Sequence, residues 1–154
     1  MRLYLAAPLF AQRERIWNRT LAEAVSRELP SVTWALPQDF RTAGRYNDAR
    51  HYGALFQRCL AEIGDADAVV AILDGSDVDS GVAFETGFAR ALGKAVIGVR
   101  TDYRPGADQG VNLMCARACR YMVREYSFGE DAEATARALC RRLRKLAEKG
   151  MARP

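Results

Sequence analysis

Histidine and closely spaced cysteines, from which most zinc sites are built, are scarce in this 154-residue sequence. His51 is the single histidine, and none of the four cysteines belongs to a C-x-x-C pair. Because a zinc site needs several such ligands at short spacings, the sequence predicts no metal centre. The cysteines, which we expect to be reduced and mostly buried, are Cys59, Cys115, Cys119 and Cys140.

Long apolar runs are also missing. No stretch approaches the roughly 18 apolar residues that a membrane-spanning helix needs. The apolar N-terminal segment is soon interrupted by Pro8 and Gln12, so it is too short for a secretion signal. With 49% hydrophobic and 27% charged residues, the composition is that of a soluble protein with a substantial core. We therefore expect one domain over residues 1–154, located in the cytoplasm and without a membrane partner.

Glycine-rich phosphate loops are absent as well. Neither G-x-G-x-x-G nor G-x-x-x-x-G-K occurs, which argues against dinucleotide and nucleoside triphosphate binding, and no cofactor is expected. The net charge of +4 suggests nucleic acid as one partner, but the basic residues gather in a C-terminal helical segment without interleaved aromatics. A solvated helix face explains that pattern better than a base-stacking surface, so no nucleic-acid partner is expected.

Short apolar runs alternate with helical patterns along the chain. The expected strands cover residues 2–7, 32–36, 68–73, 95–99 and 120–124, and the expected helices cover residues 12–29, 46–63, 81–92 and 130–149, with a further short segment at 112–119. Pro30, Gly64 and Gly93 are expected to end the first three helices. This alternation predicts an α/β fold, a flavodoxin-like (Rossmann-type), doubly wound parallel sheet of five strands in the order 2-1-3-4-5.

Ligands of such sheets bind beyond the carboxyl ends of the strands where the order reverses, which here lies between the first and third strands. The two loops at that point differ in character. The first is apolar and includes Ala7, Pro8 and Phe10. It suits packing against a flat, uncharged ligand, although a plain strand-to-helix turn explains it equally well.

The second loop carries three aspartates ahead of a helix that contains Glu85. Asp79 or Ser80 is a natural N-cap, and acids near a helix start are favourable through the helix dipole, so a structural explanation stands beside a functional one. The functional interpretation gains from the position above the expected ligand crevice. The dipole is expected to help hold Glu85 ionised, as a carboxylate nucleophile requires.

Four segments of the sequence form a distinctive set: LYLAAPLF at 3–10, LPQ at 36–38, the stretch from DAD at 65–67 through DSGVAFETGFARALGK at 79–94, and NLM at 112–114. In these segments, of which the third is the most specific, the sequence resembles the nucleoside 2-deoxyribosyltransferase family, over roughly residues 2–125. The resemblance implies a flavodoxin-like fold, oligomers built from dimers, and exchange of one nucleobase for another on 2-deoxyribose in nucleotide salvage.

The resemblance also implies roles for particular residues. Glu85 attacks the anomeric carbon and forms a covalent 2-deoxyribosyl-enzyme, as in retaining glycosidases. Tyr4 holds that glutamate, and Asp79 lines the sugar and base site. Asn112, together with Met114, reaches the 5′-hydroxyl in a neighbouring subunit, which implies a homodimer or dimer-based oligomer with shared sites. The candidate substrate-binding residues are Ala7, Pro8, Phe10, Gln38, Cys59, Gly81, Asn112 and Met114, with Gln38 matching a base-contacting glutamine.

One position departs from the family pattern. Members usually carry an aspartate that helps protonate the departing base, and here that position is Cys59. A thiol is a weaker general acid at neutral pH and a poor hydrogen-bond partner. Either another acid serves, with Glu62 and Asp79 as candidates, or the activity is low or altered.

Two other functions stay open. A related family hydrolyses 2′-deoxynucleoside 5′-monophosphates, also with a glutamate, but typically has a polar first loop and serines around the phosphate. Here the first loop is apolar and Asp79 stands six residues before the glutamate, where a carboxylate repels a phosphate dianion. The other alternative is a non-catalytic nucleoside-binding module, because the fold alone does not imply catalysis. The sequence does not determine purine or pyrimidine preference.

Overall fold

The computed structural model describes residues 1–41, 49–104, 110–126, 132–148 and 150. In chain order the elements are β1 (Arg2–Ala6), α1 (Gln12–Glu28), β2 (Thr33–Ala35), the 3-10 turn η1 (Pro37–Asp39), α2 (Ala49–Asp65), β3 (Ala68–Ile72), α3 (Ser80–Ala91), β4 (Ala95–Arg100), α4 (Leu113–Ala118), β5 (Tyr121–Arg124) and α5 (Glu133–Glu148). No helix among the described residues is long and apolar enough to cross a membrane.

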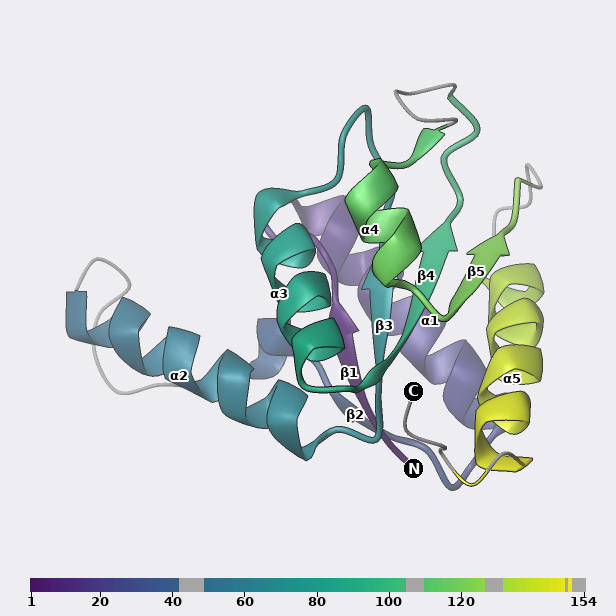
Figure 1. Cartoon of the computed structure of the whole chain (residues 1–154), viewed down its shortest axis with the longest axis horizontal. Coiled ribbons are helices and arrows are strands. Elements are labelled where there is room, and N and C mark those ends of the chain that lie inside the picture. The colour runs from purple at the N-terminus through teal and green to yellow at the C-terminus, as the bar shows by residue number, and fades with distance from the viewer. Residues whose placement is uncertain (42–48, 105–109, 127–131, 149, 151–154) are drawn as a thin grey trace.

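The sheet confirms the predicted topology. Its five strands are all parallel and lie in the order β2-β1-β3-β4-β5. Figure 1 shows α1 and α5 on one face of the sheet and α2, α3 and α4 on the other. The point at which the strand order reverses therefore lies between β1 and β3, as the strand pattern predicted. Right-handed crossovers leave few other arrangements.

Alternation along β1, which lies between β2 and β3, divides the core into two layers. Leu3 and Leu5 join the cluster under α1 and α5. Tyr4 and Ala6 point to the other face and join the cluster under α3. Successive side chains of a strand face opposite sides of the sheet, so the position of Tyr4 within β1 fixes which helix layer it meets.

The helix boundaries differ from the expected ones at a few points. Gly64 does not end its helix, because α2 continues to Asp65. Residues 46–48, 130–131 and 149, which the predicted helices included, lie outside the described residues. Gly93 does follow α3, with a φ of 71° that favours glycine.

Helix α2 is less covered than the others. Ile63 is the only side chain described in α2 that is fully buried. Tyr52 and Phe56 are 49% and 47% exposed. In Figure 1 the N-terminal end of α2 extends away from the sheet. Two aromatic side chains of this helix therefore remain about half exposed within one chain.

Candidate active site

Tyr4 and Glu85 form the central contact of the site. Tyr4 is fully buried in β1, and its hydroxyl donates a hydrogen bond to Glu85 Oε1 at 2.5 Å. The two residues are 81 positions apart in the sequence. They meet because α3 packs over the face of the sheet to which Tyr4 points. The structure thus brings the expected nucleophile and its expected holding group together.

Burial is the main influence on the pKa of Glu85. Its pKa is raised from 4.5 to about 7, first by burial and further by the negative charge of Asp79, while the hydrogen bond from Tyr4 opposes the rise. The expectation that the helix dipole keeps this carboxylate ionised is not met. Glu85 is the sixth residue of α3, and the dipole effect fades beyond the first turn. Near neutral pH Glu85 is therefore poised between its two protonation states.

Tyr4 acts only as a proton donor in this pair. Burial and the adjacent carboxylate of Glu85 raise the pKa of its hydroxyl far above the usual value. The phenol is therefore neutral over the whole physiological range. Its hydrogen bond can orient Glu85 and stabilise the ionised form without ever competing for the negative charge.

Asp79 is the N-cap of α3. Its Oδ1 accepts hydrogen bonds from the backbone N–H groups of Gly81 at 2.9 Å and Val82 at 3.1 Å. The structural explanation offered by the sequence is therefore correct for Asp79, and Ser80 is the first residue of the helix. The cap also fixes the carboxylate close enough to Glu85 to raise the pKa of that residue. Structural and functional roles are compatible at this position.

Gly81 lies on the exposed side of the same turn. A Cβ at this position would lie 3.1 Å from Asp79 Oδ1, tighter than ordinary contact. The small residue thus lets the aspartate fold back onto the first turn. A direct contact between Gly81 and substrate remains a prediction.

Cys59 lies beside the Tyr4–Glu85 pair. The half-buried thiol interacts with the Tyr4 hydroxyl and with the charge of Glu85. Its pKa is raised, mainly by burial, so the sulfur carries its proton at neutral pH. The residue that departs from the family pattern therefore occupies the site itself.

Phe40 and Arg58 were missed by the sequence analysis. The Phe40 ring packs 6.5 Å from the Tyr4 ring, and the Arg58 guanidinium carbon lies 4.4 Å from the Phe40 centroid. Phe40 therefore packs against Tyr4, and Arg58 of α2 packs on Phe40. A single aromatic after a turn and a single arginine on a helix carry no distinctive pattern, so no signal in the sequence pointed to them.

The loop after β1 is held by a residue that the sequence analysis also missed, Asn18. This buried asparagine of α1 donates to the Pro8 carbonyl at 2.9 Å and to Gln38 Oε1 at 3.2 Å. Gln38 in turn donates to the Arg15 carbonyl at 3.1 Å. A polar residue on the buried face of an amphipathic helix was an available signal. The base-contacting role of Gln38 remains a prediction, because both ends of its amide here bind the protein.

The remaining residues of that loop differ in exposure. Ala7 is buried, whereas the Phe10 side chain is 73% exposed. Phe10 is therefore accessible to a ligand or to another subunit. Its expected contact with substrate, like those of Ala7 and Pro8, stays a prediction.

Asn112 and Met114 lie apart from Glu85 in the same chain. Asn112 caps α4 by accepting from the Met114 N–H at 3.0 Å, and Met114 is 77% exposed. Both line a groove of about 710 Å³ between α3 and α4. Neither forms a hydrogen bond with Tyr4 or Glu85 within the described parts of the chain.

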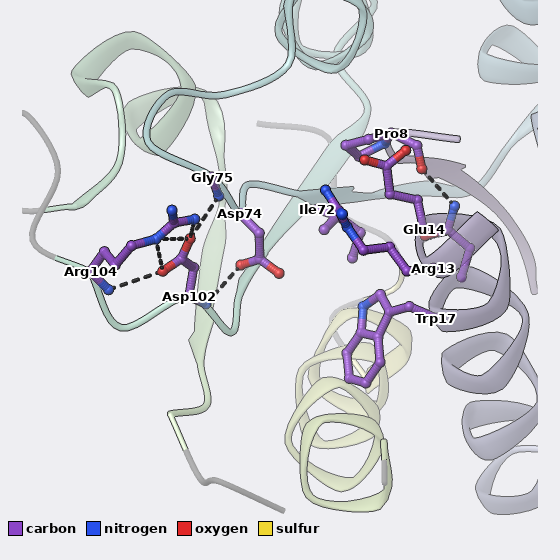
Figure 2. A pocket seen from close by; sticks show the side chains of 10 residues that line it. Pro8, Arg13, Glu14, Trp17, Ile72, Asp74, Gly75, Asp102 and Arg104 are labelled. Carbon is purple, nitrogen blue, oxygen red and sulfur yellow. Dashed lines mark hydrogen bonds and ion pairs between the residues drawn. The ribbon is translucent and has the colours of Figure 1, made fainter. Parts of the chain in front are cut away.

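A separate cleft of about 400 Å³ opens at the switch point, between the N-terminal turns of α1 and the loops after β3 and β4. Figure 2 shows Pro8 and Trp17 on one side and Asp74 and Asp102 on the other. This is where the strand order predicted a ligand crevice. Glu85 does not line it, because α3 covers the opposite face of the sheet.

Asp74 has a structural role in that cleft. Its carboxylate accepts from the Thr101 N–H and hydroxyl, both at 2.6 Å, and from the Asp102 N–H at 3.0 Å. Asp102 is paired with Arg104, which lowers the pKa of that carboxyl below its usual range. The acids of the loop after β3 thus do not act as one group: Asp74 ties two loops together, and Asp79 caps a helix. No cluster of three or more metal-ligating side chains occurs among the described residues.

The sheet is parallel and doubly wound, and it holds a part-buried carboxylate against a tyrosine hydroxyl. These features define an α/β protein of flavodoxin-like topology with a carboxylate-centred site. The family model of nucleoside 2-deoxyribosyltransferases matches residues 3–114. The chain belongs to this family, whose members are N-glycosyl enzymes that act on nucleosides and nucleobases. No curated protein matches the sequence at a significant level.

Several solved structures share the fold. A conserved protein from Enterococcus faecalis is 25% identical, with coverage of 92% of this chain and 98% of that one and a TM-score of 0.71. The 2-deoxyribosyltransferase of Bacillus psychrosaccharolyticus is 23% identical, with coverage of 88% and 96% and a TM-score of 0.64. A CMP N-glycosidase from Clostridium botulinum is 16% identical, with coverage of 94% and 99% and a TM-score of 0.55.

Proposed function

We propose that the protein is a nucleoside 2-deoxyribosyltransferase that cleaves the N-glycosidic bond of 2′-deoxynucleosides, in nucleotide salvage. The observation that carries this proposal is the part-buried Glu85 carboxylate held at 2.5 Å by the Tyr4 hydroxyl. A carboxylate nucleophile must be oriented and shielded from water, and this pair provides both. The family to which the chain belongs supports the same reaction class.

The reaction proceeds by double displacement. An ionised Glu85 oxygen attacks the anomeric carbon as the bond to the nucleobase nitrogen breaks, and the base departs with the electron pair. A nitrogen of a second base then attacks the same carbon and releases the Glu85 carboxylate, or water does so and yields free deoxyribose. Tyr4 holds Glu85 in the attacking orientation throughout.

The departing base needs a proton or a strong hydrogen bond. Of the two acids considered from the sequence, Glu62 is occupied by an ion pair with Arg2 and lies near Arg58. Asp79 uses Oδ1 for its cap and is close to Glu85, so it is the better candidate. Cys59 supplies only a weak donor.

A shared site between two subunits is part of the proposal. Asn112 and Met114 are exposed, as are Leu113 on α4 and Phe84 on α3. Exposed apolar side chains gathered on neighbouring helices are typical of association surfaces. We propose that Asn112 and Met114 complete the site of a second copy in a homodimer or a dimer-based oligomer.

The second candidate is hydrolysis of a 2′-deoxynucleoside 5′-monophosphate, an activity class consistent with the fold shared with a CMP N-glycosidase. The charges near Glu85 disfavour it. Asp79 and Glu85 place two carboxyl groups close together, and a phosphate dianion beside them is repelled. Non-catalytic nucleoside binding is the third candidate, which the exchange of the usual aspartate for Cys59 keeps open.

One experiment separates these functions. Wild-type protein, Glu85→Gln and Glu85→Ala are incubated with deoxyinosine, with and without adenine, and free hypoxanthine and deoxyadenosine are measured. Deoxyadenosine is expected only with adenine, and both variants are expected to keep less than about a tenth of the wild-type rate. Deoxyinosine 5′-monophosphate and inosine are run in parallel. Faster release from the monophosphate supports the hydrolase, and no release from any substrate supports the binding module.

A further inference from the structure

A strongly basic hollow lies at the opposite end of the sheet from the carboxyl-end cleft. It has a volume of about 300 Å³ and lies between the last turns of α3 and α4 and the start of β4. Its charged lining side chains are Arg90, Lys94, Arg117 and Arg120. None of the described residues that line it is acidic, so the hollow concentrates positive charge in a concave surface.

Two tight turns bring these side chains together. After α3, Gly93 adopts a φ of 71°, its N–H binds the Arg90 carbonyl at 3.0 Å, and the Lys94 N–H binds the Ala89 carbonyl at 2.9 Å. After α4, the Cys119 N–H donates to the Ala116 carbonyl at 3.3 Å, and the Arg120 N–H donates to the Val96 carbonyl of β4 at 2.8 Å. Basic residues are favourable in the last turn of a helix through its dipole. The dipole accounts for single cations at each helix end, but it does not require them to converge on one hollow.

The cations differ in how firmly they are held. Lys94 is half-buried, and its ammonium donates to the Gly64 carbonyl at 2.5 Å and the Ala66 carbonyl at 2.9 Å. These bonds fix the ammonium and leave one of its three protons for another acceptor. Arg90 and Arg117 are exposed, and neither forms an ion pair within the described parts of the chain. The hollow therefore combines one fixed cation with two whose guanidinium groups are available.

We propose that this hollow binds a phosphate-type anion, such as inorganic phosphate, pyrophosphate or the terminal phosphates of a nucleotide. Guanidinium groups match the oxygens of such anions in a two-pronged geometry, and a fixed ammonium adds a point charge. An anion with more than one negative charge also relieves the mutual repulsion of the converging cations. The site goes beyond the proposed transferase activity and does not depend on it.

The anion is not the 5′-phosphate of a substrate on Glu85. Arg90 follows Glu85 by five residues on α3, which corresponds to about 7.5 Å along the axis and about 140° around it. Glu85 points to Tyr4 and the sheet, so Arg90 projects from a different face of the helix. A ligand in the hollow therefore occupies a second site.

Titration calorimetry at low salt with pyrophosphate tests the proposal. The Arg90→Gln/Arg117→Gln double variant is expected to bind at least about tenfold more weakly than wild type, since two charge-assisted contacts are lost. Arg137→Gln/Arg141→Gln is the matched control, because both arginines are exposed on α5 and the loss of charge is the same. Arg90→Lys/Arg117→Lys keeps the charge but loses the two-pronged guanidinium geometry, and is expected to bind more weakly than wild type and more tightly than the glutamine double variant.

The outcomes separate the possible ligands. Inorganic phosphate, pyrophosphate and deoxyinosine 5′-monophosphate are compared on the Glu85→Gln protein, so that no substrate is consumed. Equal weakening in the two glutamine double variants, or no pyrophosphate binding by the wild type, would overturn the proposal. Binding of a single-stranded oligonucleotide without binding of pyrophosphate would also overturn it, in favour of a nucleic-acid surface.

Discussion

Replacing Glu85 by glutamine is expected to abolish activity and yet to stabilise the folded protein above neutral pH. The folded state raises the pKa of Glu85 from 4.5 to about 7. Because each pKa unit corresponds to about 1.4 kcal/mol, keeping the carboxylate ionised in the folded protein costs about 3 kcal/mol. Glutamine has the same shape and no charge to bury, and its carbonyl can still accept the hydrogen bond from Tyr4.

The direction of the pH dependence follows from proton binding. Between about pH 4.5 and 7 the folded state keeps the proton on Glu85 while the unfolded chain has released it, so wild-type stability falls as the pH rises through this window. Above about pH 7 both states are ionised and the loss is complete. The advantage of Glu85→Gln is therefore absent near pH 4 and full at pH 8.

Thermal unfolding by circular dichroism between pH 4 and 9 measures the effect. For a domain of this size about 3 kcal/mol corresponds to a rise in Tm of about 6–12 °C at pH 8. Glu23→Gln, which removes an exposed carboxylate from α1, is the control and should change Tm little at any pH. A Tm difference between Glu85→Gln and wild type that does not change with pH would refute the reasoning, as would a less stable variant at pH 8.

Three further predictions concern the reaction. Because the nucleophile must be ionised, kcat/KM for base release should fall as the pH drops below about 7; a flat profile from pH 5 to 8 would contradict the role of Glu85. Cys59→Asp should raise the rate of base release at least about tenfold by supplying a general acid, whereas Cys59→Ser should give no such gain. A lower Tm of Cys59→Asp without a higher rate would show that residue 59 has only a packing role. Asp79→Ala should lower the free energy of unfolding by about 1 kcal/mol, because the N-cap is lost. Asp79→Asn keeps the cap, so it should slow base release without lowering stability. An Asp79→Asn enzyme as fast as wild type would show that Asp79 is not the proton donor.

Local patterns in the sequence were sufficient to predict the sheet order. The continuous apolar run before Asp74 is a buried parallel strand, and the alternation of strands with helices allows few topologies. The ends of α2 were less predictable. Gly64 is tolerated inside the helix because glycine costs only about 1 kcal/mol relative to alanine there, and the helix ends only at Asp65.

Some residues of the candidate site were likewise predictable from the sequence, and others were not. The resemblance to the family pointed to Tyr4 in the segment 3–10 and to Glu85 in the segment 79–94, and to Cys59 as a departure from the pattern, and the structure places the three together. For Asp79, the sequence offered the N-cap role and the role in the site only as alternatives, whereas the structure shows that the two are compatible. Asn18 and Phe40, which hold the loop after β1 and cover Tyr4, depend on contacts between distant segments and were not found.

By itself, the sequence determined the fold class and the strand order, because periodicity and spacing are local properties of the chain, and its resemblance to the family pointed to Glu85 as the residue at the centre of the proposed chemistry. Only the tertiary structure decided the charge of that residue. The helix start near Glu85 suggested an ionised carboxylate, but burial of this carboxyl group between α3 and the sheet and the nearby charge of Asp79 outweigh a dipole that fades within one turn. Burial and the separation of charges depend on how distant segments pack, and a linear pattern does not contain them.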